Sequence, residues 1–198
     1  MNKDAFWQLL EDSRRHSPSR SRREAFLAER LAALPADHIV QFQTHLDIAG
    51  ERAYTWDLWG AAARIFGGWC SDDGFDYFTL WLVGRGQEPF ESAVADPDAL
   101  AGFPEIRRLA GRHRRTWTSD EEWPEWESLD YLAAKSYGLA TGDDDECFEA
   151  FYGLVEVRLS GHQFPRNPRG DRWDARDEAT SARRVPHLAE MFSIESQR

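Results

Sequence analysis

Long apolar runs and cysteines are both scarce in this sequence. No stretch of about 18 consecutive apolar residues occurs, so no membrane-spanning helix is predicted. The N-terminus becomes polar within a few residues and lacks the continuous apolar core of a signal peptide. The two cysteines, Cys70 and Cys147, fit no CxxC or Cys/His spacing, which argues against a disulfide scaffold or a structural zinc site. We therefore expect a cytoplasmic protein with no membrane partner, and we predict neither a cofactor nor a metal centre.

Familiar catalytic signatures are missing as well. The chain contains no HExxH, GxSxG, GxxxxGK[ST] or GxGxxG motif, which removes the sequence support for zinc hydrolysis, α/β-hydrolase chemistry and P-loop phosphoryl transfer. Positive charge is in deficit, because the formal net charge is −11 and the isoelectric point is about 5.0. A protein whose main ligand is nucleic acid normally carries the opposite sign, so we do not expect DNA or RNA in that role.

Strand signals are nearly absent, whereas the helical period dominates. There is no sustained two-residue alternation and no Asn-Gly hairpin turn. Apolar residues recur at three- and four-residue steps in segments near 6–10, 27–34, 39–53, 54–66, 71–84, 129–140, 148–159 and 186–192. The polar, tryptophan-rich stretch 117–127 is interpreted as an irregular surface loop. The sequence thus predicts one all-α domain over residues 1–198, a compact multi-helix unit around central helices near 54–66 and 71–84.

The stretch GGWCSDDGFDYF (67–78) marks the start of the second central helix. Gly67-Gly68 ends the preceding helix, and Ser71 or Asp72 is suited to cap the next one. Asp73 falls in the first turn, where the helix dipole favours negative charge. Phe75, Phe78 and Leu82 share the opposite side of this helix at three- and four-residue steps. This pattern predicts a buried helix whose N-terminal end opens to solvent.

A candidate site follows from that position. Its acids are Asp57, Asp72 and Asp73, which serve either as helix caps, as ligand-binding groups or as acid/base groups. Trp56 and Trp69 are its candidate walls, with core packing as the alternative role of the tryptophans. Arg85, just past the same helix, is a candidate anion contact. These six side chains are the ligand-binding candidates.

Three segments together resemble a known family. WDLWGAA (56–62), GGWCSDDGFDYFTLWL (67–82) and ADPDALA (95–101) look like the signature of the bacterial domain of unknown function numbered 4240. The stretch ESLDYLAAKSY (127–137) is compatible with it. The resemblance covers about residues 1–140, which leaves a C-terminal helical extension over about 141–198. It supports the fold unit and implies no activity, cofactor or catalytic residue.

Several functions stay open at this point. We expect a binding or interaction protein that acts on a protein partner. The alternative is an enzyme or ligand sensor whose acidic and aromatic pocket lies at the N-terminal end of the 71–84 helix. A divalent cation is one candidate ligand of that pocket. Small size and acidity also suggest an antitoxin-like or immunity role, testable by coexpression with a toxin. The arginine-rich stretches 14–23 and 108–115 are interpreted either as solvated surface or as contacts for an anionic partner or phosphate.

Overall fold

The helical periodicity of the sequence is realised throughout the computed structural model, which describes residues 1–142 and 148–194. Its helices are α1 (Lys3–His16), α2 (Arg20–Ala32), α3 (Ala36–Ala53), α4 (Trp56–Ile65), α5 (Asp72–Val83), α6 (Gln87–Ala95), α7 (Pro104–Arg107), α8 (Ser128–Thr141), α9 (Glu149–Leu159), α10 (Glu178–Arg184) and α11 (Pro186–Met191), with short 3-10 helices η1 (Pro97–Gly102) and η2 (Arg114–Thr116). Over the described residues there is no strand, only an isolated bridge between Thr55 and Arg169. The predicted all-α class is confirmed. None of these helices is both long and apolar enough to cross a bilayer.

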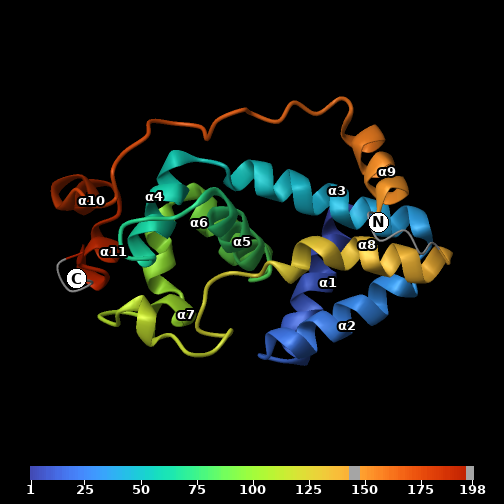
Figure 1. The fold of residues 1–198 in the computed structure, drawn as a ribbon, viewed down its shortest axis with the longest axis horizontal. Helices are drawn as coiled ribbons and strands as arrows, with labels where there is room; N and C mark the ends of the chain where they lie inside the picture. Colours follow the sequence, from blue (N-terminus) through green and yellow to red (C-terminus); the bar gives the residue numbers. More distant parts are fainter. Residues whose placement is uncertain (143–147, 195–198) are drawn as a thin grey trace.

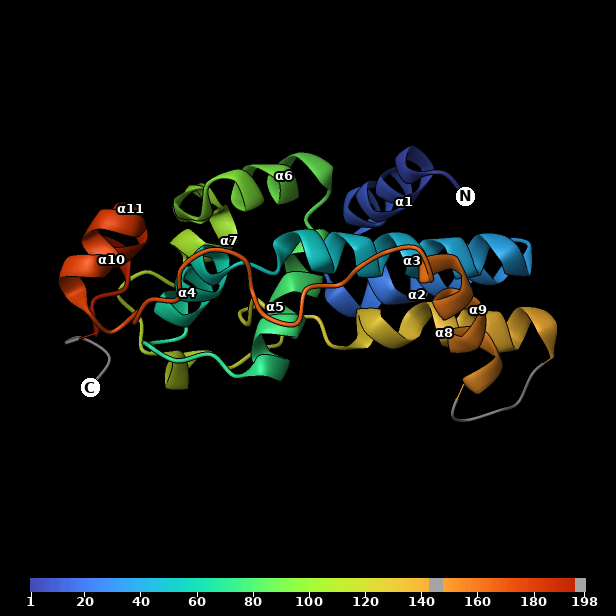
Figure 2. The same ribbon diagram turned by 90° about the horizontal axis from the view of Figure 1, so that it is seen from above.

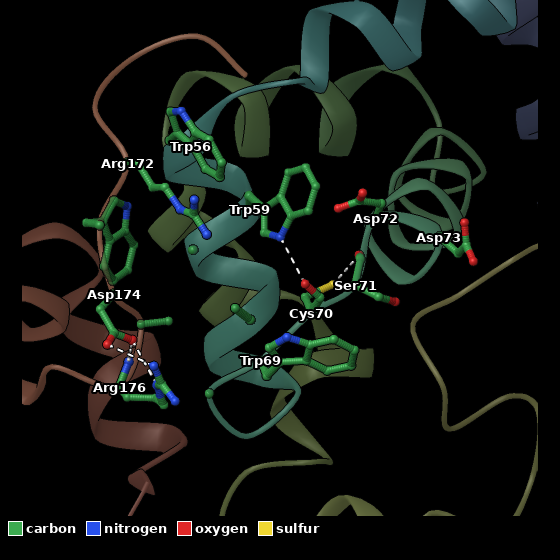
Figure 3. A pocket seen from close by; sticks show the side chains of 15 residues that line it. Trp56, Trp59, Trp69, Cys70, Ser71, Asp72, Asp73, Arg172, Asp174 and Arg176 are labelled. Atoms are coloured by element: carbon green, nitrogen blue, oxygen red, sulfur yellow. Dashed lines mark hydrogen bonds and ion pairs between the residues drawn. The ribbon is translucent and has the colours of Figure 1, made fainter. Parts of the chain in front are cut away.

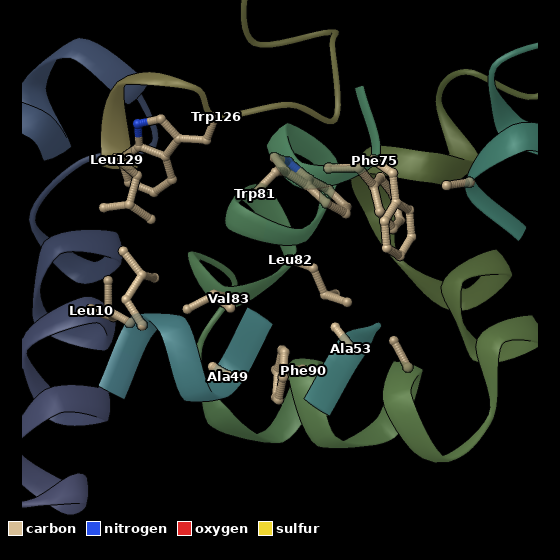
Figure 4. Close-up of a cluster of buried hydrophobic side chains, with 14 of the residues drawn as sticks. Leu10, Ala49, Ala53, Phe75, Trp81, Leu82, Val83, Phe90, Trp126 and Leu129 are labelled. Atoms are coloured by element: carbon tan, nitrogen blue, oxygen red, sulfur yellow. The ribbon is translucent and has the colours of Figure 1, made fainter. Parts of the chain in front are cut away.

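Helix α5 lies at the centre of the core. Phe75, Phe78 and Leu82, the residues that the helical period places on one side, are almost fully buried. Side chains from α1, α3, α6 and the stretch before α8 surround the helix, as Figure 4 shows for Leu10, Ala49, Ala53, Phe90 and Trp126. Burial of large apolar side chains on this scale is the main favourable term in folding. The core therefore fixes the position of α5 and of the polar residues at its two ends.

The remaining helices gather on either side of α5. Helices α1, α2, α3, α8 and α9 lie towards one end of the molecule, and α4, α7, α10 and α11 lie towards the other (Figure 1). The segment between α9 and α10 runs along the outside past α3 and α4 (Figures 1 and 2). It is held there by two backbone hydrogen bonds, from Trp56 N to Arg169 O (2.8 Å) and from Arg169 N to Tyr54 O (3.0 Å). The C-terminal part of the chain thus returns to cover α4.

The structure differs from the sequence prediction in its short elements. Helices α6 and α10 were not predicted, because each is brief and α6 carries Pro89 within its first turn. The stretch 117–127 is irregular, as predicted, but Trp117 and Trp126 are only 5% and 2% exposed, so it is not a simple surface loop. Trp126 fits beside Gly84, where a Cβ would lie 2.5 Å from its ring. Residues 143–147, which include Cys147 and most of the acidic stretch that opens the C-terminal extension, lie outside the described residues.

Candidate functional site

A cavity of about 910 Å³ lies at the N-terminal end of α5. Three elements form it: one face of α4, the turn that leads into α5, and the segment 172–176 from the C-terminal part of the chain (Figure 3). The side chains that define it are Trp56, Trp59, Trp69, Cys70, Asp72, Asp73, Arg172, Trp173, Asp174 and Arg176. We call it the tryptophan cavity. Its volume lies in the range of small-ligand pockets, and its walls combine aromatic rings with charges of both signs.

The turn before α5 is built by local sequence signals. Gly67 and Gly68 have φ of 83° and 100°, a left-handed backbone that favours glycine, and this reverses the chain after α4. Ser71 is the N-cap of α5, and its Oγ accepts a hydrogen bond from Gly74 N at 3.1 Å. Asp72 and Asp73 therefore occupy the first turn, both exposed, without supplying the cap. Of the two predicted cap residues, the structure selects Ser71.

Tryptophans line the α4 side of the cavity at different depths. Trp59 stacks on Phe75 with ring centroids 4.5 Å apart, and its Nε1 donates to the carbonyl oxygen of Cys70 at 3.2 Å. Trp56 lies against Trp59 at 5.5 Å between centroids. Trp69 is 64% exposed, the largest exposure of any tryptophan in the described residues. The inner two rings are thus structural walls, whereas Trp69 offers a free aromatic surface.

The opposite wall comes from the C-terminal segment. The Arg172 guanidinium lies 4.9 Å from the centre of the Trp56 ring, and Arg176 pairs with Asp174 at 3.1 Å. Trp173 packs directly on Gly60 of α4, where a Cβ would lie 2.2 Å from the indole ring. Fully buried Arg64 anchors the segment by donating to Ala175 O at 3.0 Å. Gly60 and Arg64 therefore let the chain close the cavity from this side.

Cys70 is a free thiol at the base of the cavity, and its environment opposes ionisation. Burial, followed by the negative charges of Glu125, Asp76 and Asp72, raises the pKa of Cys70 to about 12. The thiol is therefore protonated at neutral pH. A nucleophilic cysteine needs the opposite shift.

The six predicted site residues do not all meet. Trp56, Trp69, Asp72 and Asp73 line the tryptophan cavity together. In Figure 3 the Asp72 carboxylate points towards Trp59, whereas that of Asp73 points away from the tryptophans. Asp57 does not line the cavity; its Oδ1 accepts from Arg184 Nη1 at 2.6 Å.

Arg85 also lies elsewhere, one residue past the C-cap of α5. Helix α5 has 12 residues. At a rise of about 1.5 Å per residue, its two ends are roughly 18 Å apart. Arg85 therefore lies at the C-terminal end of α5, whereas the tryptophan cavity lies at the N-terminal end.

A second cavity, of about 420 Å³, lies on another side of α5 and shares Asp73 with the first. We call it the acidic groove, because Asp47 of α3, Asp76 of α5 and Asp130 of α8 line it. Burial raises the pKa of all three carboxyl groups, that of Asp47 to about 6, and neighbouring carboxylates add to the shifts of Asp47 and Asp76. Thr79 lines the groove as well, 5% exposed and with no partner for its Oγ1 among the described residues.

Sequence reasoning missed Asp47 and Asp130. Each lies on a helix that is distant in sequence from α5, and neither belongs to a local motif. Over residues 1–142 and 148–194, no group of three or more His, Cys, Asp or Glu side chains is arranged to hold a metal ion. The acidic groove thus brings together carboxyl groups at half-buried and exposed positions, without forming a recognisable metal-ligand set in the described part of the chain.

Comparisons with known proteins agree with the resemblance noted from the sequence. Neither the curated proteins nor the solved structures gave a match. A family model described as "Protein of unknown function (DUF4240)" matches residues 1–138, which spans α1 to α7 and most of α8. The wall formed by residues 172–176 lies outside the matched region. Because the match covers more than half of the sequence, the chain belongs to the DUF4240 family.

Proposed function

We propose that this protein is a binding protein that recognises a positively charged segment of a protein partner at the acidic, aromatic end of α5. The single observation that carries the proposal is the exposed Trp69 ring beside the exposed Asp72 and Asp73 carboxylates at the tryptophan cavity. We also propose a cytoplasmic location, supported by the free thiol of Cys70, and a protein rather than a nucleic acid or a membrane as the main ligand, supported by the net charge of −11.

Trp69 supplies the apolar part of this surface. A tryptophan side chain buries roughly 150–250 Å² when it is covered, so covering the 64% that is exposed stabilises a complex by about 3 kcal/mol. Tryptophan is also among the residues that most often dominate the energy of protein interfaces. A partner that covers Trp69 would therefore gain a large share of its affinity from one side chain.

Carboxylates supply the charge preference. Asp72 and Asp73 are exposed, and Asp76 follows one turn later on the same helix. Burial, followed by the negative charges of Asp130, Asp73 and Asp72, raises the pKa of Asp76, which indicates that negative potential accumulates here. A lysine or arginine of a partner would relieve this repulsion, and such pairs set specificity and association rate.

Matched variants test the proposal. We expect wild-type protein to recover a partner from cell extract, and the purified partner to bind at least tenfold more weakly to Trp69→Ala and to Asp72→Asn/Asp73→Asn. Leu139→Ala is the control, because Leu139 is 77% exposed but lies on α8, away from the cavity. Binding should also weaken as salt is raised. Equal affinity for all four proteins would refute the proposal.

The acidic groove favours a second candidate function, an enzyme or ligand sensor for a cationic small molecule. Asp47, with a pKa of about 6, would exchange protons near neutral pH, as a general acid or base requires. A thermal-shift screen of divalent cations and small amines separates the candidates. An increase in melting temperature that is lost in Asp47→Asn but kept in Trp69→Ala supports the second candidate. An unchanged melting temperature with every compound counts against it.

A further inference from the structure

Two basic stretches that are far apart in sequence meet at the C-terminal end of α5. Arg14, Arg20 and Arg23 come from α1 and α2, and Arg108 follows α7; together with Arg85 they line a pocket of about 400 Å³. We call it the arginine pocket. Its lining contains these five arginines and two acidic residues, Glu105 and Glu121, in a protein whose net charge is −11. The local charge is thus opposite in sign to that of the whole chain.

Few carboxylates pair directly with this cluster, although the negative charges of Asp120, Glu121, Glu24 and Glu125 act on Arg20 from nearby. Among the described residues, Arg85 is the one arginine of the five in an ion pair, with Glu105. Three others donate to backbone carbonyl oxygens: Arg14 to Arg85 O at 2.8 Å, Arg20 to Trp123 O at 2.8 Å, and Arg108 to Glu121 O at 2.7 Å. A carbonyl oxygen orients a guanidinium group without cancelling its charge.

Among these arginines, the positive charge of Arg23 is the one most disfavoured by burial and by its neighbours. Arg23 is only 4% exposed, and its guanidinium donates to Ser13 Oγ at 3.2 Å and to Gly84 O. Burial, followed by the positive charges of Arg85, Arg14 and Arg20, lowers the pKa of Arg23 to about 9. Buried like charges are unfavourable unless a counter-charge joins them. An anion in the pocket would supply that counter-charge.

The guanidinium groups are also held in place before any ligand arrives. The Arg23 guanidinium lies 4.5 Å from the centre of the Trp126 ring, and that of Arg85 lies 5.8 Å from Trp81 (Figure 4 shows both tryptophans). Stacking on aromatic rings and the hydrogen bonds above restrict these side chains, so less conformational entropy is lost when they bind an anion. Planar guanidinium donors match the oxygens of phosphate in a bidentate manner.

We propose that the arginine pocket binds the phosphoryl group of a small molecule. A tetrahedral phosphate presents several acceptor oxygens in different directions, which suits donors that converge from α1, α2 and the ends of α5 and α7. A single carboxylate presents two oxygens in one plane and would engage fewer of them. The pocket volume of about 400 Å³ leaves room for a phosphate and a small organic group.

Isothermal titration calorimetry at fixed ionic strength tests this site with two probes. Pyrophosphate represents a free anion, and glycerol phosphate represents a phosphate monoester. Arg20→Gln/Arg108→Gln removes two charges from the pocket. Arg22→Gln/Arg107→Gln also removes two positive charges, but from exposed positions outside the pocket, on α2 and at the last residue of α7. We expect the first pair to weaken binding of at least one probe tenfold or more, and the control pair to change it less than twofold.

The two probes distinguish the source of the phosphoryl group. Tighter binding of the monoester identifies the ligand as an organic phosphate, and tighter binding of pyrophosphate identifies it as a free anion. Mass-spectrometric mapping of phenylglyoxal modification provides a second readout that does not depend on the variants. The bound probe should protect Arg14, Arg20 and Arg108 but not Arg22. Absence of binding by wild-type protein, equal losses in both variant pairs, or citrate binding as tight as that of either phosphate probe would overturn the proposal.

Discussion

Asp47 offers a direct measure of the electrostatic cost of the acidic groove. It lies on α3, and burial raises the pKa of its carboxyl group from 3.8 to about 6. A hydrogen bond from Gln43 Nε2 to Oδ1 at 2.8 Å opposes the shift, and the negative charge of Asp130 adds to it. The ionised form is therefore less favourable in the folded protein than in the unfolded chain.

The size and sign of the effect follow from linkage. Between pH 3.8 and about 6 the folded state holds a proton that the unfolded state has lost, so the free energy of unfolding falls as pH rises through this window. Each pKa unit corresponds to about 1.36 kcal/mol. At pH values above the folded-state pKa, the ionisable Asp47 therefore lowers the free energy of unfolding by about 3 kcal/mol, whereas near pH 4 it lowers it by about 0.5 kcal/mol.

Asp47→Asn removes the ionisable group while keeping an oxygen that can accept from Gln43. We expect this variant to exceed the wild type in free energy of unfolding by up to about 3 kcal/mol near pH 7.5 and by about 0.5 kcal/mol near pH 4, measured by urea denaturation. Asp171→Asn, at an exposed loop position, is the control and should change the free energy by less than about 0.5 kcal/mol. A loss of stability at neutral pH, or an equal gain at both pH values, would refute the assignment of a buried, unfavourable charge.

Two further predictions concern the walls of the tryptophan cavity. Gly60→Ala places a Cβ 2.2 Å from the Trp173 ring, so we expect about 1–3 kcal/mol of destabilisation and faster proteolysis of the C-terminal segment. Gly50→Ala, with nothing within 4 Å, should stabilise α3 by about 0.5–1 kcal/mol, and a similar response of both variants would contradict the packing argument. Ser71→Ala removes the cap from Gly74 N and should lower the free energy of unfolding by about 1 kcal/mol; an unchanged urea midpoint would show that the cap is not needed.

Local signals were sufficient to predict α5 and its acidic end. The glycine pair and Ser71 define the start of the helix, and the three- and four-residue spacing of Phe75, Phe78 and Leu82 identifies its buried side. These features depend on residues within one or two turns of each other. The cap and turn residues, together with the period of the apolar side chains, therefore predict them.

Features that depend on distant segments could not be predicted in this way. The cavity wall that includes Trp173 comes from beyond the family-matched region and reaches α4 only because Gly60 lacks a side chain. Asp47 and Asp130 come together through the packing of α3 against α8, beside α5. Arg85 adjoins the predicted helix in sequence, but the length of α5 separates it from Asp72. No local pattern encodes these tertiary contacts.

Photocrosslinking from position 69 tests whether the acidic, aromatic end of α5 binds a basic segment of a protein partner. A photoreactive phenylalanine analogue replaces Trp69 in one protein and Leu139, which is also exposed, in another, and both proteins are irradiated in cells. We expect one specific partner to be crosslinked from position 69 but not from position 139, through a peptide that carries lysine or arginine. The same products from both positions, or a crosslinked peptide without basic residues, would contradict it.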